Sequence, residues 1–259
     1  MKSILARMES STMMTGGVAL MGCIFYIVTM KAFWPSKSDT RRPISRVIVF
    51  LHNILLMVFS IWIFLSTAPD LFKYFIRASS WSDFALTAYQ DAEWDQFAPF
   101  ASAFYLSKFY EFIDTWIILY KRGRPEMLQM FHHVGAVITM WADVVTKCPA
   151  TWIFVVFNSF IHTFMYAYYA LTSLHIRPPW KMMITAMQIM QFIIGIGVSY
   201  AYFAVPGALN PRQTMAISLT QGYVGVVLYL FIDFAYRTYY CKTVRCNKPG
   251  HRSPPESCL

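Results

Sequence analysis

The chain has 259 residues, of which 57% are hydrophobic, 18% are aromatic and 14% are charged. A soluble domain carries about 25% charged residues, so this composition excludes an ordinary soluble protein and indicates an integral membrane protein. The formal net charge is +9, and the five cysteines form neither a CxxC metal motif nor a secreted disulfide framework.

Seven apolar stretches are long enough to cross a bilayer as helices, since a transmembrane helix needs about 20 apolar residues. They cover roughly 16–34, 47–68, 98–120, 127–146, 152–174, 181–205 and 213–236. We therefore predict an all-α integral membrane protein with one seven-helix domain over 1–236 and a basic cytosolic tail over 237–259. The first stretch lacks a clear cleavage site and is interpreted as a retained span. The longest connection, 69–97, is rich in acidic residues.

The lysines and arginines indicate how these spans are oriented. Fifteen of them fall in the first, third and fifth connections and the tail, against six on the opposite side. The positive-inside rule then predicts a lumenal N-terminus and a cytosolic C-terminus. The remaining basic residue is Lys108, which lies inside a span.

Three ionisable residues interrupt the third apolar stretch: Lys108, Glu111 and Asp114. Their spacing of three keeps them near one face of a helix. Ionisable groups inside a membrane span are costly, and a functional site is the default reason for keeping them. The alternative is a structural ion pair that ties helices together, and both interpretations can hold at once.

A second cluster opens the fourth stretch, where Gln129, His132 and His133 follow the basic turn KRGRPE. Two adjacent histidines with a third at His162 are unlike a lone, structurally satisfied histidine. A di-iron desaturase site needs about eight histidines, whereas this chain has six, two of them in a loop and the tail. Imidazole instead suits nucleophilic or acid–base chemistry near neutral pH.

The fifth and sixth stretches carry further polar residues. In NSFIHTFMYAYYAL, the residues Asn158, His162, Tyr166 and Tyr169 share one helix face and favour a lined cavity over simple packing. In TAMQIMQF, the pair Gln188 and Gln191 lines the same cavity or only joins helices by hydrogen bonds.

Most of these polar residues fall at similar depth, about 4–16 Å from the cytosolic ends of their helices. They are His52, Asn53, Glu111, Asp114, Gln129, His132, His133, Gln188, Gln191 and Asp233, with Lys108, Asn158 and His162 somewhat deeper. We expect a polar chamber that opens towards the cytosol.

The ordered motifs KFYEFIDT, QMFHH, NSFIHTFMYAYY and TAMQIMQF resemble those of the ELO family of very-long-chain fatty acid elongases. The wording is most similar to microalgal and protist elongases of polyunsaturated C18 acyl chains, which share a QxxHH box. The usual family box is HxxHH, so Gln129 replaces its first histidine. Glutamine can form hydrogen bonds there but cannot act as a base or a nucleophile.

The resemblance implies a seven-span protein of the endoplasmic reticulum whose spans two to seven form a barrel around an acyl tunnel. It implies condensation of an acyl-CoA with malonyl-CoA to give a 3-oxoacyl-CoA, CO2 and CoA, with no metal or redox cofactor. The expected partners are these substrates, membrane lipids and the ketoacyl reductase, dehydratase and enoyl reductase of the elongation cycle. The resemblance is compatible with a homodimer and implies no nucleic acid.

Our mechanistic hypothesis is a ping-pong reaction in which His132 takes the acyl group. Fixed donors on His162 and Asn158 would stabilise the oxyanion or enolate. The remaining catalytic candidates orient the histidines (Glu111, Asp114), neutralise negative charge (Lys108) or support acid–base chemistry (His133). The expected substrate-binding residues are Gln129, Tyr166, Tyr169, Gln188, Gln191, Lys121 and Arg122.

Two rival interpretations remain open from the sequence alone. A seven-helix transporter or channel would explain the buried charges but not the histidine pair together with the other motifs. An inactive lipid-binding scaffold is made slightly more plausible by Gln129. The basic cytosolic side suits the phosphates of CoA, and it equally suits anionic lipid headgroups.

Overall fold

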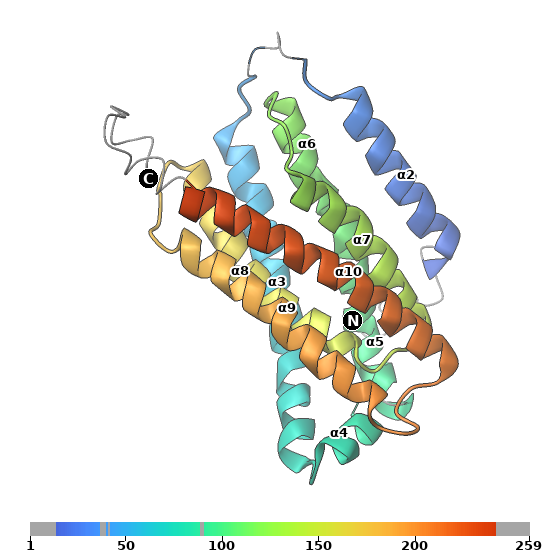
Figure 1. Cartoon of the computed structure of the whole chain (residues 1–259). Helices are drawn as coiled ribbons and strands as arrows, with labels where there is room; N and C mark the ends of the chain where they lie inside the picture. Colours follow the sequence, from blue (N-terminus) through green and yellow to red (C-terminus); the bar gives the residue numbers. More distant parts are fainter. Residues whose placement is uncertain (1–13, 37–39, 41, 89–90, 242–259) are drawn as a thin grey trace.

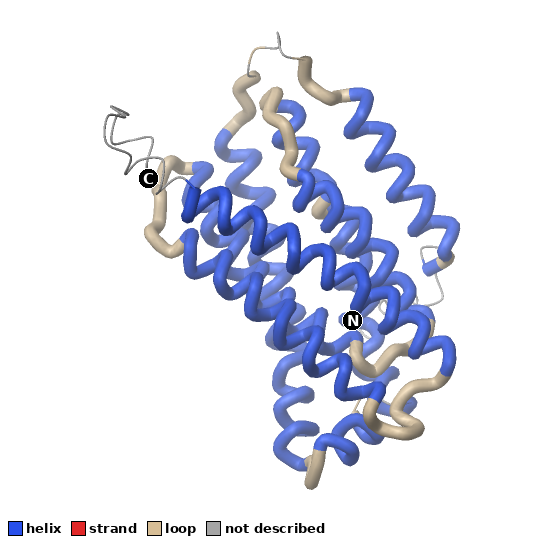
Figure 2. The backbone as a smooth tube through the Cα atoms, viewed as in Figure 1, coloured by secondary structure: helices blue, strands red, loops and turns tan. Residues whose placement is uncertain are grey.

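The structure is a computed structural model that describes residues 14–36, 40, 42–88 and 91–241. Within these residues every regular element is a helix (Figure 1), and the tube view shows no strand among them (Figure 2). Most of the predicted tail, 242–259, lies outside the described residues, as does the N-terminal segment 1–13.

The described helices follow the predicted ranges in order. They are α2 Gly16–Ala32, α3 Arg46–Arg77, α4 Trp81–Thr87, α5 Asp91–Tyr110, α6 Phe112–Tyr120, α7 Met127–Val145, α8 Thr151–Ser173, α9 Lys181–Phe203, α10 Pro211–Ala235 and the π-helical η2 Tyr236–Cys241. However, α5 and α6 divide the third range, α4 is an added short helix and η2 extends α10. Among the described residues, four helices are long and apolar enough to cross a membrane: α3, α8, α9 and α10 with its extension. The chain thus has the structure of an all-helical integral membrane protein.

Six helical segments pack in a closed order. α3 lies against α8, α8 against α9, α9 against α10, α10 against α7, α7 against α5, and α5 returns to α3. Helix α2 stands outside this ring and packs on α6 and α7, at the edge of the molecule in Figure 1. Neighbours in the ring are mostly not neighbours in the chain, so the ring brings distant motifs together.

The connection predicted over 69–97 is largely helical, which corrects the predicted boundaries. Helix α3 continues through Pro69 to Arg77, and α5 begins at Asp91 instead of residue 98. A helix interior loses a hydrogen bond at proline, and packing of Leu71 and Tyr74 against the core offsets that loss. The Ser80 side chain caps α4 by accepting from the Asp83 amide.

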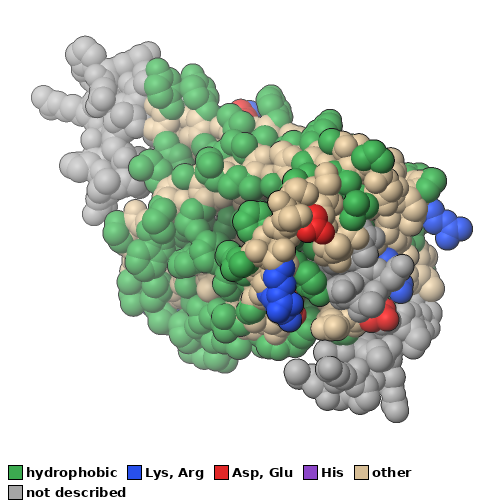
Figure 3. All heavy atoms as spheres, turned by 90° about the horizontal axis from the view of Figure 1, so that it is seen from below, with side chains coloured by type: hydrophobic (Ala, Val, Ile, Leu, Met, Phe, Trp, Pro, Cys, Tyr) green, Lys and Arg blue, Asp and Glu red, His purple; other side chains and the backbone are tan. Residues whose placement is uncertain are grey.

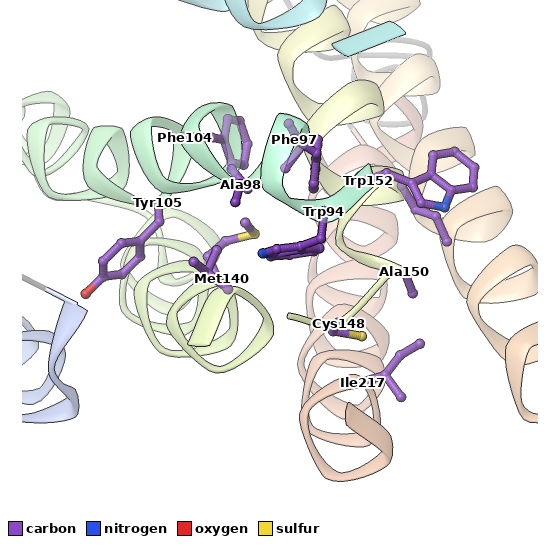
Figure 4. Close-up of a cluster of buried hydrophobic side chains, with 14 of the residues drawn as sticks. Trp94, Phe97, Ala98, Phe104, Tyr105, Met140, Cys148, Ala150, Trp152 and Ile217 are labelled. Atoms are coloured by element: carbon purple, nitrogen blue, oxygen red, sulfur yellow. The ribbon is translucent and has the colours of Figure 1, made fainter. Parts of the chain in front are cut away.

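Aromatic and apolar side chains from this segment and from α7, α8 and α10 close one end of the ring. Trp94 on α5, Met140 on α7 and Ile217 on α10 meet there with Trp152 and Cys148, as Figure 4 shows. Trp94 is 1% exposed. This core lies near the last turns of α7 and the first turns of α8 and α10, away from the α6–α7 connection.

The two ends of the bundle differ in charge. The α6–α7 and α8–α9 connections and the end of α10 lie at one end in Figure 1, and they hold many of the basic residues predicted to face the cytosol. Figure 3 views the opposite end, where described lysine and arginine side chains are few among hydrophobic ones.

Candidate active site

A cavity of about 460 Å³ lies among the ring helices and takes its lining from α3 and from α6 to α10. It contains most of the residues that the sequence predicts for the site: Glu111, Asp114, Lys121, Gln129, His132, His133, Asn158, His162, Tyr166, Tyr169, Gln188 and Gln191. Lys108 instead lines a smaller, mainly apolar cavity of about 50 Å³, which shares His132, Asn158 and Gln191 with the larger one. Arg122 lines neither cavity.

Lys108 forms the ion pair that the sequence suggested. Its Nζ donates to Glu111 Oε1 at 2.8 Å and to Asn158 Oδ1 at 3.1 Å, and it lies 3.9 Å from the centre of the Phe104 ring. Lys108 is 2% exposed and Glu111 3%. A carboxylate, an amide and an aromatic face together replace the water that the ammonium loses. Since Glu111 also lines the large cavity, the pair is both structural and part of the chamber wall.

The helix is interrupted at Glu111, which differs from the single helix predicted over 98–120. α5 ends at Tyr110 and α6 starts at Phe112. The Glu111 amide still donates to Ser107 at 2.9 Å, but its carbonyl accepts from the Asp114 amide three residues on, at 3.1 Å. This tighter, 3₁₀-type turn alters the rotation between Glu111 and Asp114.

The two carboxylates therefore serve different partners. Asp114 Oδ1 lies 2.7 Å from His52 Nε2 on α3, and Asp114 Oδ2 accepts from the Tyr166 hydroxyl on α8 at 3.0 Å. Glu111 Oε1 lies 3.8 Å from His162 Nδ1, beyond hydrogen-bonding distance. The histidine that Asp114 orients is thus His52, which was not among the predicted catalytic residues.

The adjacent histidines occupy different surroundings. His132 Nδ1 lies 2.7 Å from the Tyr223 hydroxyl of α10, and its ring is half-buried in the cavity wall. His133 is 5% exposed, sits edge-on to the rings of Tyr26 and Phe112, and its Nδ1 has no hydrogen-bond partner within the described chain. Both rings reach the cavity, but only His132 is anchored by a side-chain hydrogen bond.

Gln129 is held by a hydroxyl relay at the side of the cavity. Its Nε2 donates to Thr115 Oγ1 at 3.2 Å, and Thr115 Oγ1 lies 2.9 Å from the Tyr26 hydroxyl. The relay joins α7 to α6 and α2. Gln129 thus occupies a hydrogen-bonding position, which an amide can fill without being a base.

The α8 face forms another wall of the cavity, as the spacing predicts. His162 and Tyr166 are buried and their rings meet edge to face, with centroids 5.3 Å apart. Across the cavity on α9, Gln188 Nε2 contacts Met165 Sδ at 3.5 Å, so Gln188 both lines the cavity and joins α9 to α8. Gln191 lines both cavities.

The cavity extends to the basic end of the bundle. Lys121 follows α6, Glu126 precedes α7 and Lys181 starts α9, and all three belong to its lining. Two ammonium groups are therefore available to an anionic ligand that enters from that end.

Three side chains have the type and spacing for a metal ion: Glu111, His132 and His162 each bring a ligand atom within 4.8 Å of the others. Yet Glu111 Oε1 already accepts from the Lys108 ammonium at 2.8 Å. A divalent ion at the carboxylate would face this positive charge, so the trio fits a metal poorly.

The sequence assigned no catalytic or binding role to two residues of the site: His52, which it placed in the polar chamber, and Tyr223, which it did not single out. His52 had a signal, because a His–Asn pair in an apolar helix is costly unless it is paired. Tyr223 had no such signal in the sequence, because a single tyrosine in an apolar helix commonly serves only in packing. Only the fold places it against His132.

A sequence model of the ELO family, described as GNS1/SUR4, matches residues 11–247. Fatty acid elongase A of Dictyostelium discoideum is 27% identical over 86% of this chain and 82% of its own length. Putative fatty acid elongase 3 of Caenorhabditis elegans is 30% identical over 83% of the chain and 66% of its own length. Very long chain fatty acid elongase 5 of Bos taurus is 25% identical over 92% and 80%. With the family match covering nearly the whole chain, this protein belongs to the ELO (GNS1/SUR4) family.

Proposed function

We propose that this protein is a fatty acid elongase that condenses a long-chain acyl-CoA with malonyl-CoA. The products are a 3-oxoacyl-CoA two carbons longer, CO2 and free CoA. The observation that carries the proposal is the cavity in which His132, His162 and Asn158 come together from α7 and α8. Family membership and relatives named fatty acid elongases support it and do not favour a transporter.

The first half-reaction transfers the acyl group to the enzyme. A ring nitrogen of His132 attacks the thioester carbon, a C–N bond forms and the C–S bond breaks. CoA leaves with the electron pair of that bond and takes up a proton. An acyl-imidazole then splits one difficult carbon–carbon bond formation into two easier steps.

The second half-reaction forms the carbon–carbon bond. Malonyl-CoA loses CO2, and the electrons of the broken bond remain on its α-carbon as an enolate. The enolate attacks the acyl carbon, the C–N bond breaks and His132 is restored. Overall, one proton is consumed for each CO2 and CoA released.

Asn158 is suited to stabilise the enolate oxygen. Its Oδ1 accepts from Lys108, so its Nδ2 group is available as a donor in the cavity wall. The Lys108 ammonium behind it adds positive charge to that donor without itself entering the large cavity. The His162 ring, which faces Glu111, supplies a second group that can stabilise the negative charge of the enolate oxygen.

We extend the proposal to the membrane arrangement. Family membership suggests a protein that crosses the membrane of the endoplasmic reticulum seven times, and the lysines and arginines favour a lumenal N-terminus and a cytosolic C-terminus. CoA would then lie at the basic mouth near Lys121 and Lys181, with Arg122 beside it, while the acyl chain would lie in the larger cavity. We further propose a polyunsaturated C18 acyl chain as substrate, and the reductases and dehydratase of the elongation cycle as partners.

The direct test is purified protein incubated with C16 or C18 acyl-CoAs and labelled malonyl-CoA, without NADPH. Omitting the reductant stops contaminating enzymes from consuming the 3-oxoacyl-CoA. We expect labelled 3-oxoacyl-CoA from the wild type and none from His132→Ala. Comparing saturated with polyunsaturated C18 substrates tests the proposed acyl preference.

The matched control is Tyr202→Phe, which removes a buried hydroxyl bonded to Trp152 outside both cavities. It should retain activity. Folded wild type that yields no product with any chain, or a His132→Ala variant as active as the wild type, would contradict the proposal.

A further inference from the structure

The Tyr223 hydroxyl meets one residue at two points. Its oxygen lies 2.7 Å from His132 Nδ1 and 3.0 Å from the His132 carbonyl oxygen. Tyr223 stands on α10, 91 residues further along the chain, and lines the smaller cavity with His132. The proposed reaction assigns no step to this tyrosine.

The hydrogens available at these contacts decide the protonation of the ring. A hydroxyl has one hydrogen, and a carbonyl oxygen has none. The contact between the two oxygens therefore requires the tyrosine hydrogen. The contact of 2.7 Å between the hydroxyl oxygen and Nδ1 must then take its hydrogen from Nδ1. If Nε2 carried the proton instead, Nδ1 would be an acceptor, like the carbonyl oxygen. The single hydroxyl hydrogen could then serve only one of the two contacts, and at the other contact the hydroxyl oxygen would face an acceptor with no hydrogen between them.

We propose that Tyr223 is a positioning residue that holds His132 as the neutral Nδ1–H tautomer and leaves the lone pair on Nε2 for chemistry. The inference rests on the proposed function, because it names which nitrogen of His132 attacks the thioester. A neutral imidazole has one donor and one acceptor nitrogen, so fixing the donor fixes the nucleophile.

The fold builds a seat for this tyrosine. Gly135 lies one turn after His132 on α7, and a Cβ at position 135 would overlap the Tyr223 ring carbons Cδ2 and Cε2. The Tyr223 ring also stacks on the ring of Phe131, with centroids 5.9 Å apart. The absence of a side chain at Gly135 lets α10 approach α7 closely enough for the hydroxyl to reach His132.

The test uses the full-length protein labelled with 15N-histidine and studied by solid-state NMR in lipid bilayers. The His132 signals are those absent from His132→Ala. In the wild type we expect a protonated Nδ1 and an unprotonated Nε2. In Tyr223→Phe we expect a mixture of tautomers, because the ring keeps its packing but loses the hydroxyl.

The same variants are compared in the condensation assay. Tyr223→Phe should lower kcat about tenfold, the effect of one buried hydrogen bond, and leave KM for acyl-CoA within about twofold. Gly135→Ala keeps the hydroxyl but displaces the ring, and should give the same tautomer mixture. Tyr202→Phe, the control for loss of a buried hydroxyl, should change neither measurement.

Two results would overturn the inference: a wild-type His132 that carries its proton on Nε2, or a Tyr223→Phe variant whose His132 signals are unchanged. Both are read without substrate, so they separate this inference from the reaction. If the wild type makes no 3-oxoacyl-CoA but shows the Nδ1–H signals, the proposed function fails and the positioning of His132 stands.

Discussion

Lys108 shows how a single charged residue is kept inside an apolar bundle. Its ammonium has a carboxylate and an amide oxygen within 3.1 Å and an aromatic ring at 3.9 Å. Removing one member of a buried ion pair leaves the other charge without compensation, whereas removing both need not be costly. Stability and activity can therefore be separated at this pair.

We expect Lys108→Met to lower the free energy of unfolding by about 3–5 kcal/mol, because it leaves the Glu111 carboxylate buried and unpaired. The double variant Lys108→Met/Glu111→Leu should recover most of that loss. Neither variant should make 3-oxoacyl-CoA at the wild-type rate. Unfolding midpoints in detergent and the condensation assay measure the two effects. A double variant as unstable as the single one would show that the ion pair is not what stabilises this region.

Most of the site residues predicted from the sequence line the large cavity, but their partners were not predicted. Lys108, Glu111 and Asp114 were recognisable because charge in an apolar helix has few explanations. Their division between partners depends on the turn at Glu111 and on the placement of α3 and α8, which hydropathy does not encode. Tyr223 reaches His132 because α10 packs closely on α7, and no local sequence pattern predicts this packing contact.

At the scale of elements, α2 is attached to the ring by close packing at Gly22. A Cβ at this position would overlap the Phe109 ring of α5. We expect Gly22→Leu to lower the free energy of unfolding by about 1–3 kcal/mol, since overpacking forces the neighbouring ring or the helix to move. Thermal or denaturant unfolding in detergent measures the change.

Gly17 on the same helix is the matched control. The nearest atom that a Cβ would meet there is Thr15 Oγ1 at 4.0 Å, and the position is exposed. Gly17→Leu should leave the midpoint close to that of the wild type. Equal losses at both positions would indicate that leucine disturbs α2 itself and not its packing on α5.

The elements predicted from hydropathy were placed well where apolar residues run without interruption. The start of α10 moved two residues earlier, to Pro211, because Asn210 and Gln213 form a capping box. The error over 69–97 was larger. This acidic segment was predicted as a connection between spans, but Trp94 and Phe97 within it are core residues, and burial of those rings holds the segment in helices.

At the scale of the whole molecule, the cavity and the basic connections occupy the same end of the bundle, and an apolar core closes the other. This polarity is what an enzyme needs if a charged, water-soluble headgroup must enter from one side while an apolar chain stays in the membrane. The proposed orientation puts the open end in the cytosol.

Cysteine labelling of sealed microsomes tests the orientation. After Cys241, Cys246 and Cys258 are replaced by serine, a membrane-impermeant maleimide should label Arg124→Cys in intact vesicles. It should label Pro206→Cys, in the α9–α10 connection, only after permeabilisation. Both wild-type side chains are exposed, so access is decided by the membrane. The reverse labelling pattern would place the cavity mouth in the lumen.

The most direct test of the central claim is release of CoA from acyl-CoA by purified protein before malonyl-CoA is added. We predict a burst close to one CoA for each folded protein, absent from His132→Ala, followed by conversion of the held acyl group to 3-oxoacyl-CoA when malonyl-CoA is supplied. Folded protein that binds acyl-CoA yet gives neither the burst nor the product would contradict the account.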